Sequence, residues 1–159
     1  MTRKIRTIGE ISYDEGTLTT ISAYVDGRID ALYADYTGVV VKKGDHLALL
    51  YSPEIYAVEE ELLQSRRAMQ QSQSASLNRV PRSQKQLYEG ARIKLLELGM
   101  TEKQLRQLEL SDKSTFRIHL CAPLAGTVID KLSEEGEYVK AGQPIYRLAD
   151  LSTVRRLPT

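Results

Sequence analysis

The chain has 159 residues, of which 22 are basic and 21 acidic, so its net charge is +1 with neutral histidines. This length suffices for one domain, or two small modules, with a sizeable core. The near-zero net charge argues against a nucleic-acid partner bound by bulk electrostatics. No apolar run approaches the about 18 residues of a membrane span, and the start of the chain lacks the apolar segment of a signal peptide.

Residues 21–51 have the composition of short strands joined by tight turns. Gly27 and Gly38 mark two turns, and Val41-Lys-Lys-Gly44 precedes the apolar run Leu47-Ala-Leu-Leu-Tyr51. Glycine supplies the positive φ that such turns need. The segment therefore predicts a strand–turn–strand–turn–strand unit.

Residues 52–110 predict helices inserted after this unit. Ser52 suits a helix cap and Pro53 the first helical position. No glycine or proline follows before Val80, which predicts a helix that reaches roughly 36 Å from the strands. Its seam is apolar near the base and small or polar toward the far end, in the order Ile55, Val58, Leu62, Ser65, Met69, Ser72 and Ser76.

Two further helices complete the inserted block. Pro81 disfavours helix at the residue before it, so residues 78–82 predict a turn. A second helix then extends to Leu98, where Gly99 ends it. Thr101-Glu-Lys-Gln104 is a capping box and predicts a short third helix.

Residues 111–150 repeat the pattern of the first unit. Gly126 and Gly136 correspond to the earlier turn glycines, and Val139-Lys-Ala-Gly142 leads into the apolar run Ile145-Tyr-Arg-Leu148. Two such copies predict a pseudo-symmetric β-module whose halves pack face to face. The predicted fold class is α+β, a split β-module with a three-helix insertion.

The sequence predicts no enzyme. It has no phosphate-binding glycine loop, no nucleophile elbow and no helix-borne pair of metal-binding histidines. The acidic run Glu59-Glu-Glu61 predicts a solvated, charged helix face.

Metal binding has only weak candidates. His119 and Cys121 are two residues apart in a predicted strand and therefore share a face. Both are good ligands for soft metals, but a structural site usually has four ligands, and no third lies nearby in sequence. We therefore expect no metal site, and no affinity for Cu(I), Ag(I) or Zn(II) tighter than micromolar. We expect His46 to be a turn residue.

A β-module of two half-repeats is also similar to lipoyl and biotinyl carrier domains. Such carriers present a modified lysine at a tight hairpin between the halves, where this chain has its helical block. Lys42, Lys43 and Lys140 precede the glycines of internal turns instead. A covalent cofactor is therefore not expected, although a carrier domain remains the alternative from another functional class.

The chain resembles the periplasmic adaptors, or membrane fusion proteins, of tripartite RND-type efflux pumps. Within this family it resembles the heavy-metal efflux branch. The resemblance covers about residues 20–154. It rests on Gly27-Arg-Ile-Asp-Ala-Leu32, Thr37-Gly-Val-Val-Val-Lys-Lys-Gly44, Tyr51-Ser-Pro-Glu-Ile55, Ala91-Arg-Ile-Lys-Leu-Leu-Glu-Leu-Gly-Met100, Cys121-Ala-Pro-Leu-Ala-Gly126 and Ile145-Tyr-Arg-Leu-Ala-Asp-Leu-Ser-Thr-Val154.

The resemblance implies a division of the chain into five parts. Residues 1–20 would be partial β-barrel, with an early strand over 5–12, and residues 151–159 the start of another barrel segment. Between them would lie the lipoyl-like (barrel-sandwich hybrid) halves, 21–51 and 111–150, and the helical hairpin or bundle, 52–110. The family continues beyond the point that matches Thr159, and some members carry an N-terminal methionine-rich metal-binding segment that this sequence lacks.

The resemblance also implies partners and a location. They are an inner-membrane RND-type transporter, an outer-membrane channel and further copies of the adaptor in a ring, in the periplasm beside the inner membrane. The function would be non-enzymatic, in the export of heavy-metal cations, with a drug or protein exporter as another possibility. We expect contact with the channel at the helical tip, through Ser74, Ser76, Leu77, Asn78, Arg79 and Arg82.

Overall fold

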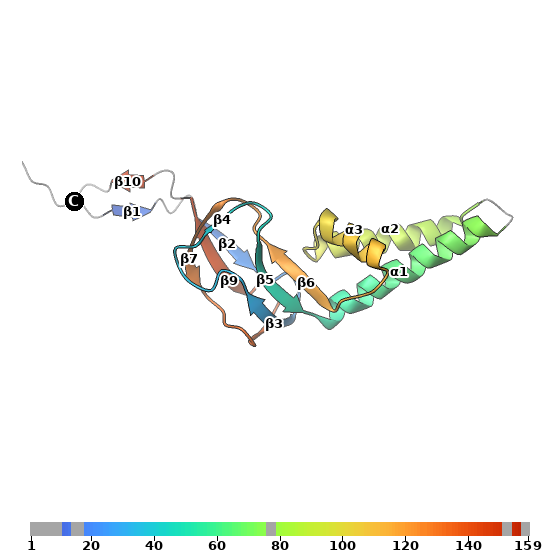
Figure 1. The fold of residues 1–159 in the computed structure, drawn as a ribbon, viewed down its shortest axis with the longest axis horizontal. Helices are drawn as coiled ribbons and strands as arrows, with labels where there is room; N and C mark the ends of the chain where they lie inside the picture. The colour runs from blue at the N-terminus through green and yellow to red at the C-terminus, as the bar shows by residue number, and fades with distance from the viewer. Residues whose placement is uncertain (1–10, 14–17, 76–78, 151–153, 157–159) are drawn as a thin grey trace, which may run out of the picture.

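The computed structural model describes residues 11–13, 18–75, 79–150 and 154–156 and shows an elongated molecule (Figure 1). A β-module occupies the middle, and helices project from one end of it. At the opposite end, β1 (Ile11–Tyr13) and β10 (Val154–Arg156) pair as a two-stranded antiparallel sheet. Residues 5–10 of the predicted first strand lie outside the described residues.

Two four-stranded sheets form the module, and each contains strands from both halves of the repeat. Their orders are β2-β9-β7-β4 and β6-β5-β3-β8. The strands are β2 (Leu18–Ser22), β3 (Gly27–Leu32), β4 (Val40–Val41), β5 (His46–Tyr51), β6 (Arg117–Cys121), β7 (Gly126–Lys131), β8 (Tyr138–Val139) and β9 (Pro144–Ala149). All pairs in these sheets are antiparallel. The predicted split barrel-sandwich hybrid is confirmed, with β2 starting ahead of residue 21.

The repeat in the sequence becomes an exchange of equivalent hydrogen bonds between the halves. The N–H of Gly44 donates to the carbonyl of Ala122 at 2.8 Å, and the N–H of Gly142 donates to the carbonyl of Ala23 at 2.7 Å. Positive φ, which few other residues adopt, is shared by the four turn glycines Gly38, Gly44, Gly136 and Gly142. The turns thus join the halves as well as reverse the chain.

Gly27 is the first residue of β3 rather than a turn residue with positive φ, and it allows two strands to approach closely. A Cβ atom at this position would lie 2.2 Å from the carbonyl oxygen of Tyr51, which real structures do not allow. At the equivalent Gly126, a Cβ would lie 3.1 Å from the carbonyl oxygen of Ala149. Any side chain at Gly27 would therefore push β3 away from the end of β5.

Apolar side chains from both sheets and from the helices form one continuous core. It includes fully buried residues from both halves, among them Ile29, Leu47, Leu50, Val128, Ile145 and Leu148. Tyr146 is also buried, and its hydroxyl donates to the carbonyl of Leu47 at 2.9 Å. Burial raises the pKa of Tyr146 to about 12, so the hydroxyl remains a donor.

Helix α1 (Pro53–Ser74) begins where the sequence predicts and ends earlier than predicted. Proline takes the first position, but the Ser52 hydroxyl makes no capping hydrogen bond. The helix stops before Ala75, which is extended, so it is slightly shorter than the roughly 36 Å that the sequence predicts. Near this end the Ser72 and Ser74 hydroxyls donate to carbonyls one turn back, and residues that do so are weak helix formers. The length of the helix is therefore about 33 Å.

Helices α2 (Arg82–Glu97) and α3 (Glu102–Ser111) complete the insertion. α2 runs back along α1 to Gly99, whose φ is positive. The predicted capping box of Thr101 and Gln104 is present at the start of α3. Within the part of the chain that the structure describes, none of the helices has the length and apolar character that a membrane span requires.

Candidate functional site: the helical tip and the junction of helices and sheet

Helices α1 and α2 meet at a tip far from the β-module (Figure 1). Ser74 ends α1, Arg82 begins α2 and Arg79 lies between them, and all three residues are exposed. The other predicted tip residues, Ser76, Leu77 and Asn78, lie outside the described residues. The structure therefore places two exposed arginines at the end of the hairpin.

Polar contacts join the two helices near this tip. The Ser72 hydroxyl lies 3.0 Å from Oε1 of Gln84, across the hairpin, and also 3.0 Å from the carbonyl of Ala68, so the two oxygens share its single hydrogen. The buried apolar residues of α1 belong to the part nearer the module and are Ile55, Val58, Leu62 and Leu63. Because little apolar area is buried near the tip, the surface there contributes little to stability and is open to a partner.

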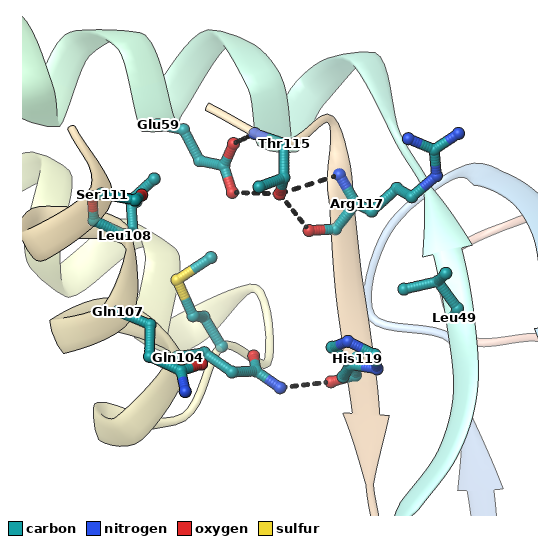
Figure 2. Close-up of a pocket in the computed structure, with 10 residues that line it drawn as sticks. Leu49, Glu59, Gln104, Gln107, Leu108, Ser111, Thr115, Arg117 and His119 are labelled. Atoms are coloured by element: carbon teal, nitrogen blue, oxygen red, sulfur yellow. Dashed lines mark hydrogen bonds between the residues drawn. The ribbon is translucent and has the colours of Figure 1, made fainter. Parts of the chain in front are cut away.

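At the other end of the hairpin, Glu59 is buried, with 1% of its surface exposed. Its carboxylate accepts the N–H of Thr115 at 2.9 Å and contacts the Thr115 hydroxyl at 3.5 Å (Figure 2). The expectation of a solvated face over residues 59–61 is wrong for Glu59. The residue follows Ile55 by four positions and precedes Leu62 by three, so it lies on the apolar face of α1.

The surroundings of Glu59 favour its neutral form. Burial raises the pKa of Glu59, while hydrogen bonds from the backbone of Thr115 and Phe116 act in the opposite direction without cancelling it. The neighbouring Glu60 accepts a 2.6 Å hydrogen bond from the Ser114 hydroxyl. Two consecutive carboxylates of α1 therefore hold the connection between α3 and β6.

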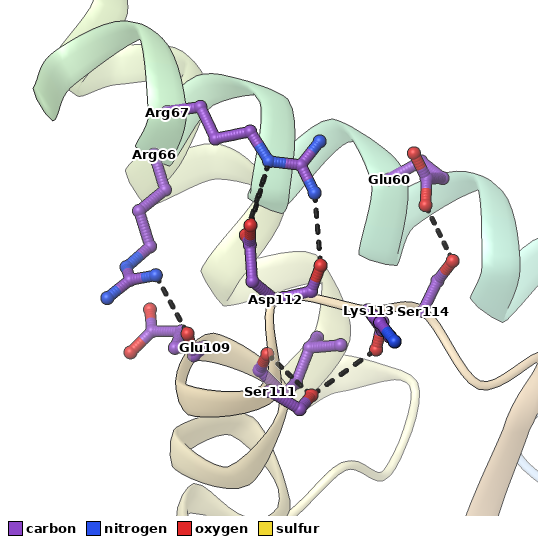
Figure 3. Close-up of polar contacts among 9 residues, drawn as sticks. Glu60, Arg66, Arg67, Glu109, Ser111, Asp112, Lys113 and Ser114 are labelled. Carbon is purple, nitrogen blue, oxygen red and sulfur yellow. Dashed lines mark hydrogen bonds and ion pairs between the residues drawn. The ribbon is translucent and has the colours of Figure 1, made fainter. Parts of the chain in front are cut away.

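Two arginines extend these contacts along α1 (Figure 3). Arg66 donates to the carbonyl of Glu109 at 2.7 Å. Arg67 donates to the Asp112 carboxylate at 3.1 Å and to the Asp112 carbonyl at 3.0 Å. These bonds tie α1 to the C-terminal end of α3.

A cavity of about 350 Å³ lies beside Glu59, between α3 and the outer face of β5 and β6 (Figure 2). Met100, Gln104 and His119 are among the residues that line it. Gln104 crosses from α3 to the sheet, where its side-chain amide donates to the carbonyl of His119 at 3.0 Å. The cavity therefore belongs to the packing of helix on sheet, with polar groups along its walls.

The two predicted weak metal candidates lie together, and a residue that sequence reasoning missed joins them. His46 starts β5 rather than occupying a turn, and it pairs in register with Cys121. The rings of His46 and His119 stack with their centroids 4.1 Å apart. Burial and the charge of His46 lower the pKa of His119, and burial raises the pKa of Cys121.

This cluster does not reach the size of a structural metal centre. Among residues 11–13, 18–75, 79–150 and 154–156, no group of three or more histidine, cysteine, aspartate or glutamate side chains is arranged to hold a metal ion. The pairing of β5 with β6 brings His46 to His119, although the two residues are more than 70 positions apart in the sequence. Local sequence carries no signal for such a contact.

Known proteins similar to this chain share its fold. The structure of ZneB from Cupriavidus metallidurans is 23% identical, with a TM-score of 0.54 over 91% of this chain and 65% of ZneB. A MacA-MexA chimera that contains the α-hairpin domain of Pseudomonas aeruginosa MexA is 25% identical, with a TM-score of 0.53 over 94% of this chain and 52% of the chimera. This chain therefore spans about half to two thirds of their lengths. No curated protein matches the sequence.

The family assignment rests on most of the module and all of the helices. The family of CzcB-like barrel-sandwich hybrid domains matches residues 17–150, which begin just before β2 and end just after β9. The matched segment thus contains both halves of the repeat and the insertion between them. The chain belongs to the CzcB-like barrel-sandwich hybrid family of membrane fusion proteins.

Proposed function

We propose that this chain forms the barrel-sandwich hybrid and hairpin of a non-enzymatic periplasmic adaptor. The complete adaptor would link an inner-membrane RND-type transporter to an outer-membrane channel and would be held at the inner membrane. The main support for this proposal is the shape of the molecule. The hairpin projects from one end of the module, and β1 and β10 lie at the opposite end (Figure 1). Such a shape suits a spacer between partners on its two sides.

Each part has a distinct role in this proposal. The tip, with Ser74, Arg79 and Arg82, contacts the channel, because its side chains are exposed and its arginines can donate charge-assisted hydrogen bonds. The module packs beside copies of itself in a ring around the transport path. The contacts of Glu59, Arg66 and Arg67 at the junction keep the hairpin aligned with that path.

The proposed cargo is a heavy-metal cation, and the support for it is the CzcB-like family match. An adaptor of a drug or protein exporter would have the same architecture. A lipoyl or biotinyl carrier is less favoured, since β5 leads directly into α1 and three helices stand where a carrier has its tight, lysine-bearing hairpin. A carrier would gain the mass of its cofactor, so the intact mass of natively expressed protein should equal the mass calculated from the sequence.

Deletion and complementation in the native host test the proposed function. Loss of the complete adaptor gene should lower tolerance to at least one transition-metal salt, and the intact gene should restore it. Tolerance to a panel of antibacterial organic compounds should not change. If the deletion strain became sensitive to those organic compounds alone, the adaptor would belong to a drug exporter. If tolerance to every compound were unchanged and the intact mass revealed a covalent cofactor, the protein would be a carrier domain and not an adaptor.

A further inference from the structure

The outer face of the β5–β6 pair carries two histidines in contact. His46 is the first residue of β5 and His119 the third of β6. The register pairs His46 with Cys121 and Leu49 with His119, which sets the histidines on neighbouring positions of one face. Their rings are nearly parallel, with 20° between the planes and 4.1 Å between the centroids. The chain contains no other histidine.

One nitrogen of this pair has no partner in the protein. The Nδ1 atom of His119 is buried and makes no hydrogen bond. Buried polar atoms are nearly always satisfied, so an orphaned nitrogen indicates that something else satisfies it. The carbonyl of the same residue is fixed by Gln104, and the ring of Tyr33 lies 6.1 Å from the ring of His119. His119 is therefore held in place, whereas His46 is exposed.

We propose that His46 and His119 bind one divalent transition-metal ion, such as Zn²⁺ or Cu²⁺, through one ring nitrogen of each. Imidazole is a preferred ligand of both ions. Two such ligands from adjacent strands form a chelate whose rigid partner, His119, is already oriented. Binding requires His46 to rotate out of the stack so that its nitrogen points to the same ion, and water completes the coordination.

The site uses the imidazoles and not the thiol. Cys121 lies across the strand pair from His46, but its Sγ is engaged at 3.5 Å with the side-chain amide of Gln104 and at 3.7 Å with the carbonyl of His119. Burial also raises the pKa of this thiol, which disfavours the thiolate that a metal requires. With two protein ligands, the expected affinity is micromolar. This inference goes beyond the proposed function and holds whatever the pump exports.

Calorimetric titration of the chain with Zn²⁺, on protein that carries no polyhistidine tag, tests the site. We expect one equivalent to bind, with the affinity reduced at least about tenfold in His46→Ala and in His119→Ala. Cys121→Ser and Tyr33→Phe are matched controls that should bind as the wild type does. Cu²⁺ added below stoichiometry should broaden amide NMR signals near residues 33, 46 and 119, and leave those of the helical tip sharp.

Three results would each overturn the proposal. The first is a double variant, His46→Ala with His119→Ala, that is folded by NMR and binds Zn²⁺ as the wild type does. The second is loss of binding in Cys121→Ser, which would indicate a thiolate site instead. The third is broadening by Cu²⁺ centred away from the two histidines. Because none of these measurements uses export, their failure would leave the adaptor proposal standing.

Discussion

Replacing Arg79 and Arg82 with glutamate in the full-length adaptor is expected to abolish export. Both side chains are exposed at the hairpin tip, and the double change turns two positive charges into two negative ones. If the channel offers carbonyl or carboxylate acceptors to these arginines, the reversed charges repel them. Export is measured in a strain that lacks the adaptor gene, as the tolerance that a plasmid-borne adaptor restores. The double variant should restore none.

The same double change should leave the fold intact. Exposed substitutions away from specific contacts usually alter stability by no more than about 0.5 kcal/mol. For a chain of this size, the thermal midpoint should therefore move by about 2 °C or less. Lys103 and Arg106, exposed on α3 at the other end of the helices, provide a charge-matched control. Export by the tip variant at wild-type level and equal expression would remove the tip from the mechanism.

Replacing Glu59 with alanine is expected to destabilise the chain by about 2 kcal/mol, since a buried side chain is removed and the N–H of Thr115 loses its acceptor. Glu59→Gln keeps a side-chain carbonyl of the same shape and should retain most of this stability. Urea unfolding of both variants at neutral pH would measure the difference. If the glutamine variant were as unstable as the alanine variant, the negative charge rather than the acceptor would be what holds Thr115.

The pH dependence of the Glu59→Gln comparison has a defined sign. Because burial raises the pKa of Glu59, the folded chain retains this proton at a pH where the unfolded chain has lost it. The stability that Glu59 provides is therefore fully present below its unfolded pKa of about 4.3 and is lost as the pH rises through the folded pKa. Relative to the wild type, the glutamine variant should gain stability as the pH rises above about 4. If the difference in stability between the two proteins changed with pH in the opposite direction, it would contradict the raised pKa of Glu59.

The parts of the fold that sequence reasoning predicted correctly are those with local signals or an internal copy. Gly44 and Gly142 sit in matching surroundings, and their hydrogen bonds to opposite halves explain why the spacing repeats. The capping box at Thr101 and the proline at the start of α1 need only the neighbouring residues to act. Such features are legible in one sequence because the physics that fixes them is short-ranged.

The features that sequence reasoning missed depend on distant parts of the chain. Three consecutive glutamates look alike, yet only Glu59 is fully buried, and its position relative to Ile55 and Leu62 was the available signal. The contact of His46 with His119 depends on strand register, which no local pattern specifies.

The central claim is that the helical tip of an adaptor meets an outer-membrane channel, and site-specific cross-linking tests it most directly. A photoreactive residue is placed at position 79 of the full-length adaptor in living cells, and at position 103 as the control. We expect a cross-linked product that contains the outer-membrane channel protein from position 79 and none from position 103. An export-competent adaptor that cross-links from position 79 only to the inner-membrane transporter, or to nothing, would contradict it.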